Sequence, residues 1–133
     1  MRAEKLMSIR VAVQEALKVT GGREEIVMIP FTGEAEGPCF TGRVVGPGVD
    51  TQTILPGEPA ALSARYMLEG TDAEGRPCRV FVENTGVWGV RFTPRIVTDS
   101  PLLRPWESMK LSATVEGIPG GVLVSVWREE EEA

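Results

Sequence analysis

Four polar residues in otherwise apolar stretches have the chemistry to form a site: Asp50, Gln52, Tyr66 and Asn84. Asp50 and Gln52 are two positions apart, so on a strand their side chains share one face. A carboxyl group in an apolar interior has a raised pKa and exchanges protons near neutral pH, while a neutral phenol donates a hydrogen bond. We predict that the four residues line one cavity. If the protein is an enzyme, Asp50 is the expected base and Tyr66 the expected hydrogen-bond donor.

Each candidate has a structural alternative. Asp50 follows a Gly-Pro-Gly-Val run, where an aspartate commonly serves as an acceptor in a turn. Trp106 follows a proline in an expected loop and would form a lid or wall at the cavity rim, or else pack in the core. Arg95 could attract an anionic ligand, but a solvated strand arginine has the same sequence pattern. Both are therefore ligand-binding candidates with a competing interpretation.

The chain contains no histidine, which excludes Ser-His-Asp and Cys-His nucleophile systems and nearly every zinc site. Cys39 and Cys78 lie far apart and neither belongs to a CxxC motif, so we expect both thiols to be reduced and buried. Most of the glycines lie between the expected strands or at their ends, and none precedes an expected helix whose N-terminus could bind a phosphate. We expect no metal and no cofactor.

With 133 residues the chain has the length of one domain. Its net charge is −5, and four acidic residues at 129–132 leave the rest near −1, so no basic surface indicates nucleic acid. We predict one domain at 1–128 and an acidic, disordered tail at 129–133. Without an apolar run of membrane-spanning length or a secretory signal, the expected location is the cytoplasm.

Alternating stretches separated by glycine and proline turns predict an all-β fold, a barrel or a sandwich. The expected strands lie at 6–14, 25–32, 39–46, 49–55, 60–70, 77–86, 90–98, 109–116 and 121–128. Residues 2–18 also fit an amphipathic helix ending at a glycine pair. We favour a strand there because helical patterns are otherwise absent.

A turn at 72–76 sets the register of the hairpin that carries the tyrosine. Arg65 then opposes Glu83 on an outer face with a second ion pair, each pair worth about 0.2–1 kcal/mol. The inner face holds Tyr66 opposite Val82, with Asn84 beside them. Because side chains alternate, we expect Arg65 to point away from the site.

The last hairpin is expected to place Leu111, Ala113 and Val115 opposite Val126, Val124 and Val122, with Lys110 beside Trp127 in a cation–π contact. Apolar residues then occupy outer faces that a single barrel leaves in water: Met67 with Phe81, and Leu123 with Trp127. We therefore expect a homodimer or higher homo-oligomer.

The ordered segments "GEAEGPCFTGRVVGPGVDTQ", "ARYMLEGTDAEG", "VENTG" and "TPRIVTDS" resemble the family called domain of unknown function 3237, which comprises small, mainly bacterial proteins. The resemblance covers most of residues 8–128. It implies a single antiparallel β-barrel of about eight to nine strands, calycin-like or similar to the dirigent and allene oxide cyclase barrels. It implies no activity. The chain departs from the pattern at Ala73-Glu74, which lengthens a turn, and at Glu107-Ser108, where the family has Leu-Asn.

Three functions remain open. The first is binding of a small, partly apolar molecule in the barrel lumen or mouth. The second is a cofactor-free isomerase, cyclase or lyase that uses Asp50 and Tyr66. The third is a structural or assembly protein with a filled barrel. A solvent-connected lumen containing Asp50 and Tyr66 favours the first two, and a packed lumen favours the third.

Overall fold

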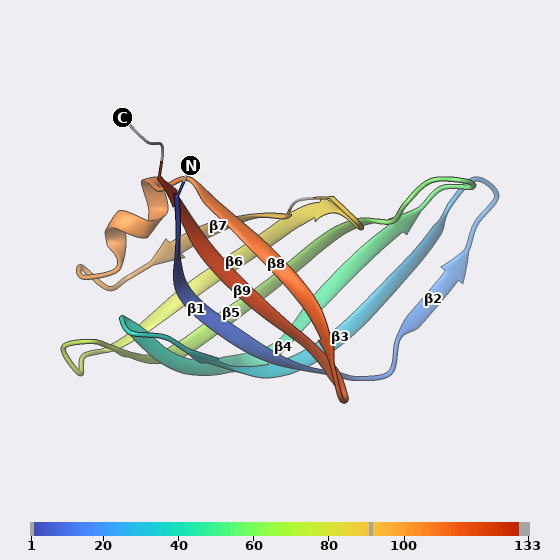
Figure 1. Cartoon of the computed structure of the whole chain (residues 1–133). Helices are drawn as coiled ribbons and strands as arrows, with labels where there is room; N and C mark the ends of the chain where they lie inside the picture. The colour runs from blue at the N-terminus through green and yellow to red at the C-terminus, as the bar shows by residue number, and fades with distance from the viewer. Residues whose placement is uncertain (1, 91, 131–133) are drawn as a thin grey trace.

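The computed structural model describes residues 2–90 and 92–130, which form nine strands and one short 3-10 helix. The strands are β1 (Arg2–Val13), β2 (Leu17–Thr20), β3 (Glu25–Glu36), β4 (Phe40–Ile54), β5 (Ala61–Asp72), β6 (Pro77–Val87), β7 (Phe92–Thr98), β8 (Leu111–Ile118) and β9 (Gly121–Glu130), and the helix is η1 (Arg104–Ser108). The neighbouring strands are antiparallel in the order β1-β9-β8-β7-β6-β5-β4-β3, and β1 also pairs with β3. Eight strands thus close a barrel, and β2 adds a ninth on the outer edge of β3 (Figure 1).

The prediction of a single antiparallel barrel is confirmed, and residues 2–13 form a strand rather than a helix. Two expected strands, 39–46 and 49–55, are one continuous strand, β4. The expected turn between them is a bulge: the pairing with β5 shifts between Val45 and Val49, and Gly46 adopts a φ of 65°. The short strand β2 was not predicted, because its four residues are all exposed and carry no buried face.

The predicted register of the β5–β6 hairpin is confirmed. Arg65 lies opposite Glu83, with its Nε 3.0 Å from a Glu83 carboxylate oxygen, and Tyr66 lies opposite Val82. The ion pair is on the outer surface, where the arginine side chain is exposed, and Tyr66 is buried. Arg65 and Tyr66 are adjacent in sequence and point to opposite faces of the barrel wall.

The predicted register of the β8–β9 hairpin is wrong by two residues. Val115 faces Val124, because the turn at Pro119-Gly120 pairs Ile118 with Gly121 and fixes all later pairs. An even shift preserves the inner and outer faces. It changes the neighbours, however, so Trp127 lies under the Lys5 ammonium, 5.3 Å from the ring centroid, rather than beside Lys110.

The predicted start of the tail at residue 129 is too early. Strand β9 continues through Glu130, with Glu129 opposite Ala3 of β1. The Glu129 amide also donates to the Lys110 carbonyl at 2.9 Å. Residues 131–133 lie outside the described residues.

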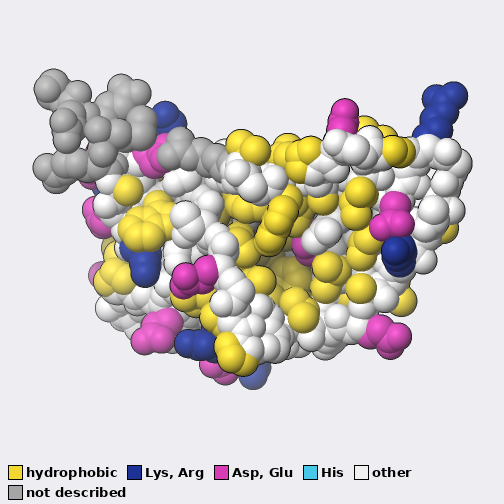
Figure 2. All heavy atoms as spheres, turned by 45° about the vertical axis from the view of Figure 1, so that its right-hand side comes forward, with side chains coloured by type: hydrophobic (Ala, Val, Ile, Leu, Met, Phe, Trp, Pro, Cys, Tyr) yellow, Lys and Arg dark blue, Asp and Glu magenta, His cyan; other side chains and the backbone are white. Residues whose placement is uncertain are grey.

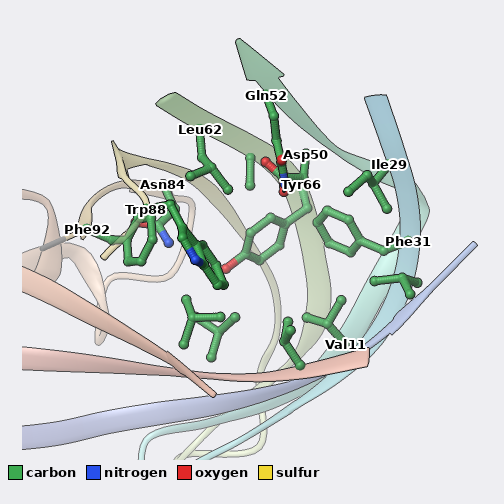
Figure 3. Close-up of a pocket in the computed structure, with 15 residues that line it drawn as sticks. Val11, Ile29, Phe31, Asp50, Gln52, Leu62, Tyr66, Asn84, Trp88 and Phe92 are labelled. Atoms are coloured by element: carbon green, nitrogen blue, oxygen red, sulfur yellow. Dashed lines mark hydrogen bonds between the residues drawn. The ribbon is translucent and has the colours of Figure 1, made fainter. Parts of the chain in front are cut away.

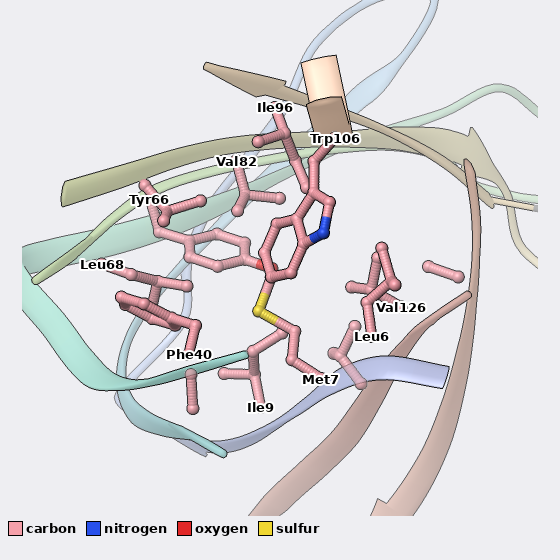
Figure 4. Packing of buried hydrophobic residues seen from close by; sticks show 14 of the residues in the cluster. Leu6, Met7, Ile9, Phe40, Tyr66, Leu68, Val82, Ile96, Trp106 and Val126 are labelled. Atoms are coloured by element: carbon pink, nitrogen blue, oxygen red, sulfur yellow. The ribbon is translucent and has the colours of Figure 1, made fainter. Parts of the chain in front are cut away.

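The half of the barrel beneath η1 is packed. Its core contains Leu6, Met7, Ile9, Phe40, Leu68, Val80, Val82, Ile96, Trp106 and Val126. Trp106 is only 4% exposed and reaches from η1 into the middle of this cluster (Figure 4). The aromatic side chain therefore closes this end of the barrel.

A polar network holds the segment that precedes η1 against the β5–β6 turn. The Ser100 hydroxyl donates to Asp72 at 3.0 Å, and the amides of Glu74 and Arg76 donate to the other Asp72 oxygen at 2.9 and 3.1 Å. Burial alone would raise the pKa of Asp72, but these hydrogen bonds outweigh it and lower that pKa. The network is satisfied within the protein and stabilises the closed end.

None of the helices in the described part of the chain has the length and apolar character needed to cross a membrane. Cys39 and Cys78 are free thiols; Cys78 is buried as predicted, but the prediction is wrong for Cys39, which is only partly buried.

Candidate functional site

The half of the barrel away from η1 is hollow. A cavity of ≈ 180 Å³ opens there, lined by fifteen of the described residues, most of them apolar. Figure 2 shows the hollow, whose walls and floor are covered by hydrophobic side chains. Asp50, Gln52, Tyr66 and Asn84 all line it, as the sequence predicts.

Three neighbouring strands place the polar groups. Asp50 of β4 lies opposite Ala64 of β5, and Ala64 lies opposite Asn84 of β6. Directly opposite residues share a face, so the Asp50 carboxylate and the Asn84 amide lie on either side of the Ala64 methyl group. Tyr66 follows Ala64 by two positions and occupies the same face (Figure 3). The small side chain of Ala64 leaves open the space that these groups surround.

Only one of the two Asp50 carboxylate oxygens has a hydrogen-bond partner among the described residues. Its Oδ2 accepts a hydrogen bond of 2.9 Å from Gln52 Nε2. Its Oδ1 is buried and makes no hydrogen bond within the described part of the chain. Burial raises the pKa of Asp50, and the hydrogen bond from Gln52 offsets only part of that rise. The group therefore binds a proton more readily than an ordinary aspartate.

Tyr66 has a well-packed ring and an unpartnered hydroxyl. The side chain is 6% exposed, and its ring meets Phe31 in a T-shaped contact, with centroids 5.4 Å apart. Gly48 makes this arrangement possible, because a Cβ there would lie 2.5 Å from the Phe31 ring. The hydroxyl is buried without a hydrogen bond to any described residue. Burial raises the pKa of Tyr66, so the phenol is neutral and available as a donor.

Asn84 completes the polar set. Its side chain is 7% exposed, and its Oδ1 is a third buried atom with no hydrogen-bond partner among the described residues. An unsatisfied buried polar group costs about 1–3 kcal/mol. Three such atoms around one cavity are therefore a costly arrangement for a protein with no use for them.

Trp88 is a rim residue that sequence reasoning missed. It follows β6, is 55% exposed, and makes a T-shaped contact with Phe92 at 6.4 Å between ring centroids. Both rings line the cavity. The sequence carried a signal, since Trp88 directly precedes Gly89 in the short connection between the expected strands 77–86 and 90–98.

Two predicted ligand-binding residues do not reach the cavity. Trp106 belongs to the packed half, so its expected position at the rim is wrong, because η1 turns the indole inward. Arg95 lies on the outer surface, with Nε 3.2 Å from Glu83 and its guanidinium over the Phe81 ring. Among the residues that the structure describes, no group of three or more His, Cys, Asp or Glu side chains could hold a metal ion.

Comparison with known proteins gives a family and a fold. The family model described as "Protein of unknown function (DUF3237)" matches residues 1–100. A UPF0311 protein of Clostridium acetobutylicum is 30% identical over 92 residues, which is 65% of this chain and 54% of that protein. The match thus spans about half the length of that curated relative.

Solved structures agree with the barrel. A protein of unknown function from Clostridium acetobutylicum superposes with a TM-score of 0.85 at 23% identity, covering 98% of this chain and 100% of the other. A protein from Penicillium herquei, described only as an enzyme, gives a TM-score of 0.79 at 16% identity, covering 97% and 94%. At these identities the likeness shows the fold alone. Together with the family match over three quarters of its length, this establishes that the chain belongs to the DUF3237 family of proteins of unknown function.

Proposed function

We propose that the protein binds a small, partly apolar molecule in the open half of the barrel. The observation that carries the proposal is that three residues lining one mostly apolar cavity each have a buried polar atom without a hydrogen-bond partner among the described residues: Asp50 Oδ1, Tyr66 OH and Asn84 Oδ1. A binding site typically combines apolar walls with a few directed polar groups that orient the ligand. The filled-barrel alternative accounts for the half beneath η1 but not for the hollow half.

The volume limits the ligand. An engineered apolar cavity of about 150 Å³ admits benzene. The cavity of ≈ 180 Å³ therefore suits one ring with a short substituent, and a larger molecule would extend past Trp88 into solvent.

Binding of 2-phenylethanol, a neutral probe of that size, tests the proposal. We expect saturable binding by titration calorimetry, together with a change in Trp88 fluorescence measured in a background where Trp106 and Trp127 are phenylalanine. Ala64→Leu fills the space between Asp50 and Asn84 and should abolish binding. Val97→Leu is the matched control, because Val97 is exposed outside the cavity and should leave binding intact. Equal binding by the wild type and Ala64→Leu would reject the cavity as the site.

A second candidate function is proton transfer at carbon. It is favoured by one observation, a carboxyl group of raised pKa and a neutral phenol in the same cavity, both with unpartnered oxygens. Asp50 Oδ1 would remove a proton next to a carbonyl group, and the Tyr66 hydroxyl would donate to the developing enolate oxygen. This is the chemistry of a cofactor-free isomerase, cyclase or lyase.

Exchange of the α-protons of 2-indanone in D2O, followed by NMR, tests this activity without a known substrate. A positioned base contributes about 10²–10⁴-fold, so catalysis should be measurable above the buffer rate. Asp50→Asn and Tyr66→Phe should each reduce it. An exchange rate that is the same for the wild type and Asp50→Asn would rule out this pair as the catalyst.

A further inference from the structure

The described residues that line the cavity include an acidic side chain but no basic one. Asp50 and Tyr66 are the titratable side chains among the described lining residues, and no described Lys or Arg side chain lines the cavity. Arg95 forms an ion pair with Glu83 on the outer surface. An anionic ligand would lie beside a carboxylate with no described cation near it in the lining, an arrangement that costs free energy.

The unpartnered atoms mainly require donors. Asp50 Oδ1 and Asn84 Oδ1 are acceptors, and they flank Ala64 in a row of directly opposite residues. The Tyr66 hydroxyl can donate or accept. A protonated amine has up to three N–H donors and no acceptor, so it matches this set. A single hydroxyl group supplies only one donor.

The walls are unusually aromatic. Phe31, Tyr66, Trp88 and Phe92 line the cavity, half of the eight aromatic residues in the chain. The faces of aromatic rings attract cations, and the attraction reaches about 2 kcal/mol when the cation is desolvated. A cavity that combines a carboxylate with aromatic walls is therefore a suitable environment for an organic cation.

We infer that the cavity binds a primary or secondary amine in its protonated form, attached to an aromatic or apolar group, with the nitrogen held between Asp50 and Asn84. This inference rests on the proposed binding function and specifies its ligand class. The Tyr66 hydroxyl accepts a further N–H, and the ring of the ligand lies against the aromatic walls beneath Trp88.

Binding is then linked to the protonation of Asp50. The groups that face it are Gln52 on its own strand, Ile29 opposite on β3, and Ala64, Tyr66 and Asn84 from β5 and β6, of which only Tyr66 titrates. An adjacent ammonium favours the ionised carboxylate. Amine affinity should therefore rise as pH increases through the pKa of Asp50, and fall near pH ~10, where alkylammonium groups lose their proton.

The test uses three compounds of matched shape: 2-phenylethylamine, 2-phenylethanol and phenylacetate. Calorimetry at pH 7.5 should show the amine binding at least about tenfold tighter than the alcohol, which corresponds to ~1.4 kcal/mol, and no binding of the carboxylate. Asp50→Asn should weaken amine binding by about tenfold or more and change alcohol binding by less than about threefold. Glu58→Gln is the matched control, since it removes the same charge from an exposed loop residue outside the cavity and should leave all three affinities unchanged.

The outcomes separate the two proposals. If the alcohol or the carboxylate binds as tightly as the amine, or if Asp50→Asn weakens amine and alcohol equally, the inferred ligand class is wrong and the binding cavity stands. Amine affinity that does not change with pH through the pKa of Asp50 also overturns the ligand class. If none of the three compounds binds at millimolar concentration, both the ligand class and the proposed binding function fail.

Discussion

Replacing Tyr66 with phenylalanine should stabilise the protein. The substitution removes a buried hydroxyl that has no hydrogen-bond partner among the described residues and keeps the ring against Phe31. The free energy of desolvating that hydroxyl, about 1–3 kcal/mol, is then no longer lost on folding. Sites maintained for function commonly gain stability when their functional groups are removed.

The expected change in melting temperature follows from the chain length. Unfolding entropy near ~2.1 cal/mol/K per residue makes 1 kcal/mol equivalent to about 4 °C for this chain. Tyr66→Phe should therefore raise Tm by about 4–11 °C. Urea unfolding followed by circular dichroism gives the same quantity as a free energy of unfolding.

Thr98→Val is the matched control, because it also removes one hydroxyl from a side chain that is 7% exposed. The Thr98 hydroxyl has partners: it donates to the Arg79 carbonyl at 2.7 Å and accepts from the Ser100 amide at 3.1 Å. Its removal should destabilise the protein by about 1–3 kcal/mol, the opposite sign. If Tyr66→Phe also destabilises by more than about 1 kcal/mol, the hydroxyl has a partner in the native state and the argument for an unsatisfied site is refuted.

Three further predictions concern the site and the wall around it. Asp50→Asn should raise the free energy of unfolding at pH 7. Because the folded-state pKa of Asp50 is raised, the wild type loses stability as pH rises through that pKa. The stability gained by the variant should therefore vanish in acid, as measured by titrations followed by circular dichroism. Gly48→Ala should destabilise by about 1–3 kcal/mol, because its Cβ would collide with an aromatic ring, whereas Gly117→Ala meets no atom within 4 Å and should be tolerated in the same urea experiment. Arg65→Ala should cost less than about 1 kcal/mol in urea unfolding, because its ion pair with Glu83 is solvent-exposed, and a loss of several kcal/mol would contradict that.

The sequence by itself determined the local alternation and therefore which side chains share a face. The turn at 72–76 and the alternating residues around it were enough to predict every described pair of the β5–β6 hairpin. They also placed Tyr66 and Asn84 inside and Arg65 outside. These features depend on neighbours within one hairpin, where the two-residue period and the turn length leave little freedom.

Features that depend on distant segments were decided only by the tertiary structure. Gly46-Pro47-Gly48 has the composition of a turn, but pairing with β5 on both sides makes it a bulge in one long strand. Trp106 has the sequence context of a loop, and only the packing of η1 over the barrel end buries it. Likewise, the division of the lumen into a packed half and a hollow half arises from the summed volumes of side chains on eight strands. No local pattern encodes that sum, so the sequence could propose a cavity around Asp50 against the alternative of a filled barrel, but only the assembled barrel decided between them.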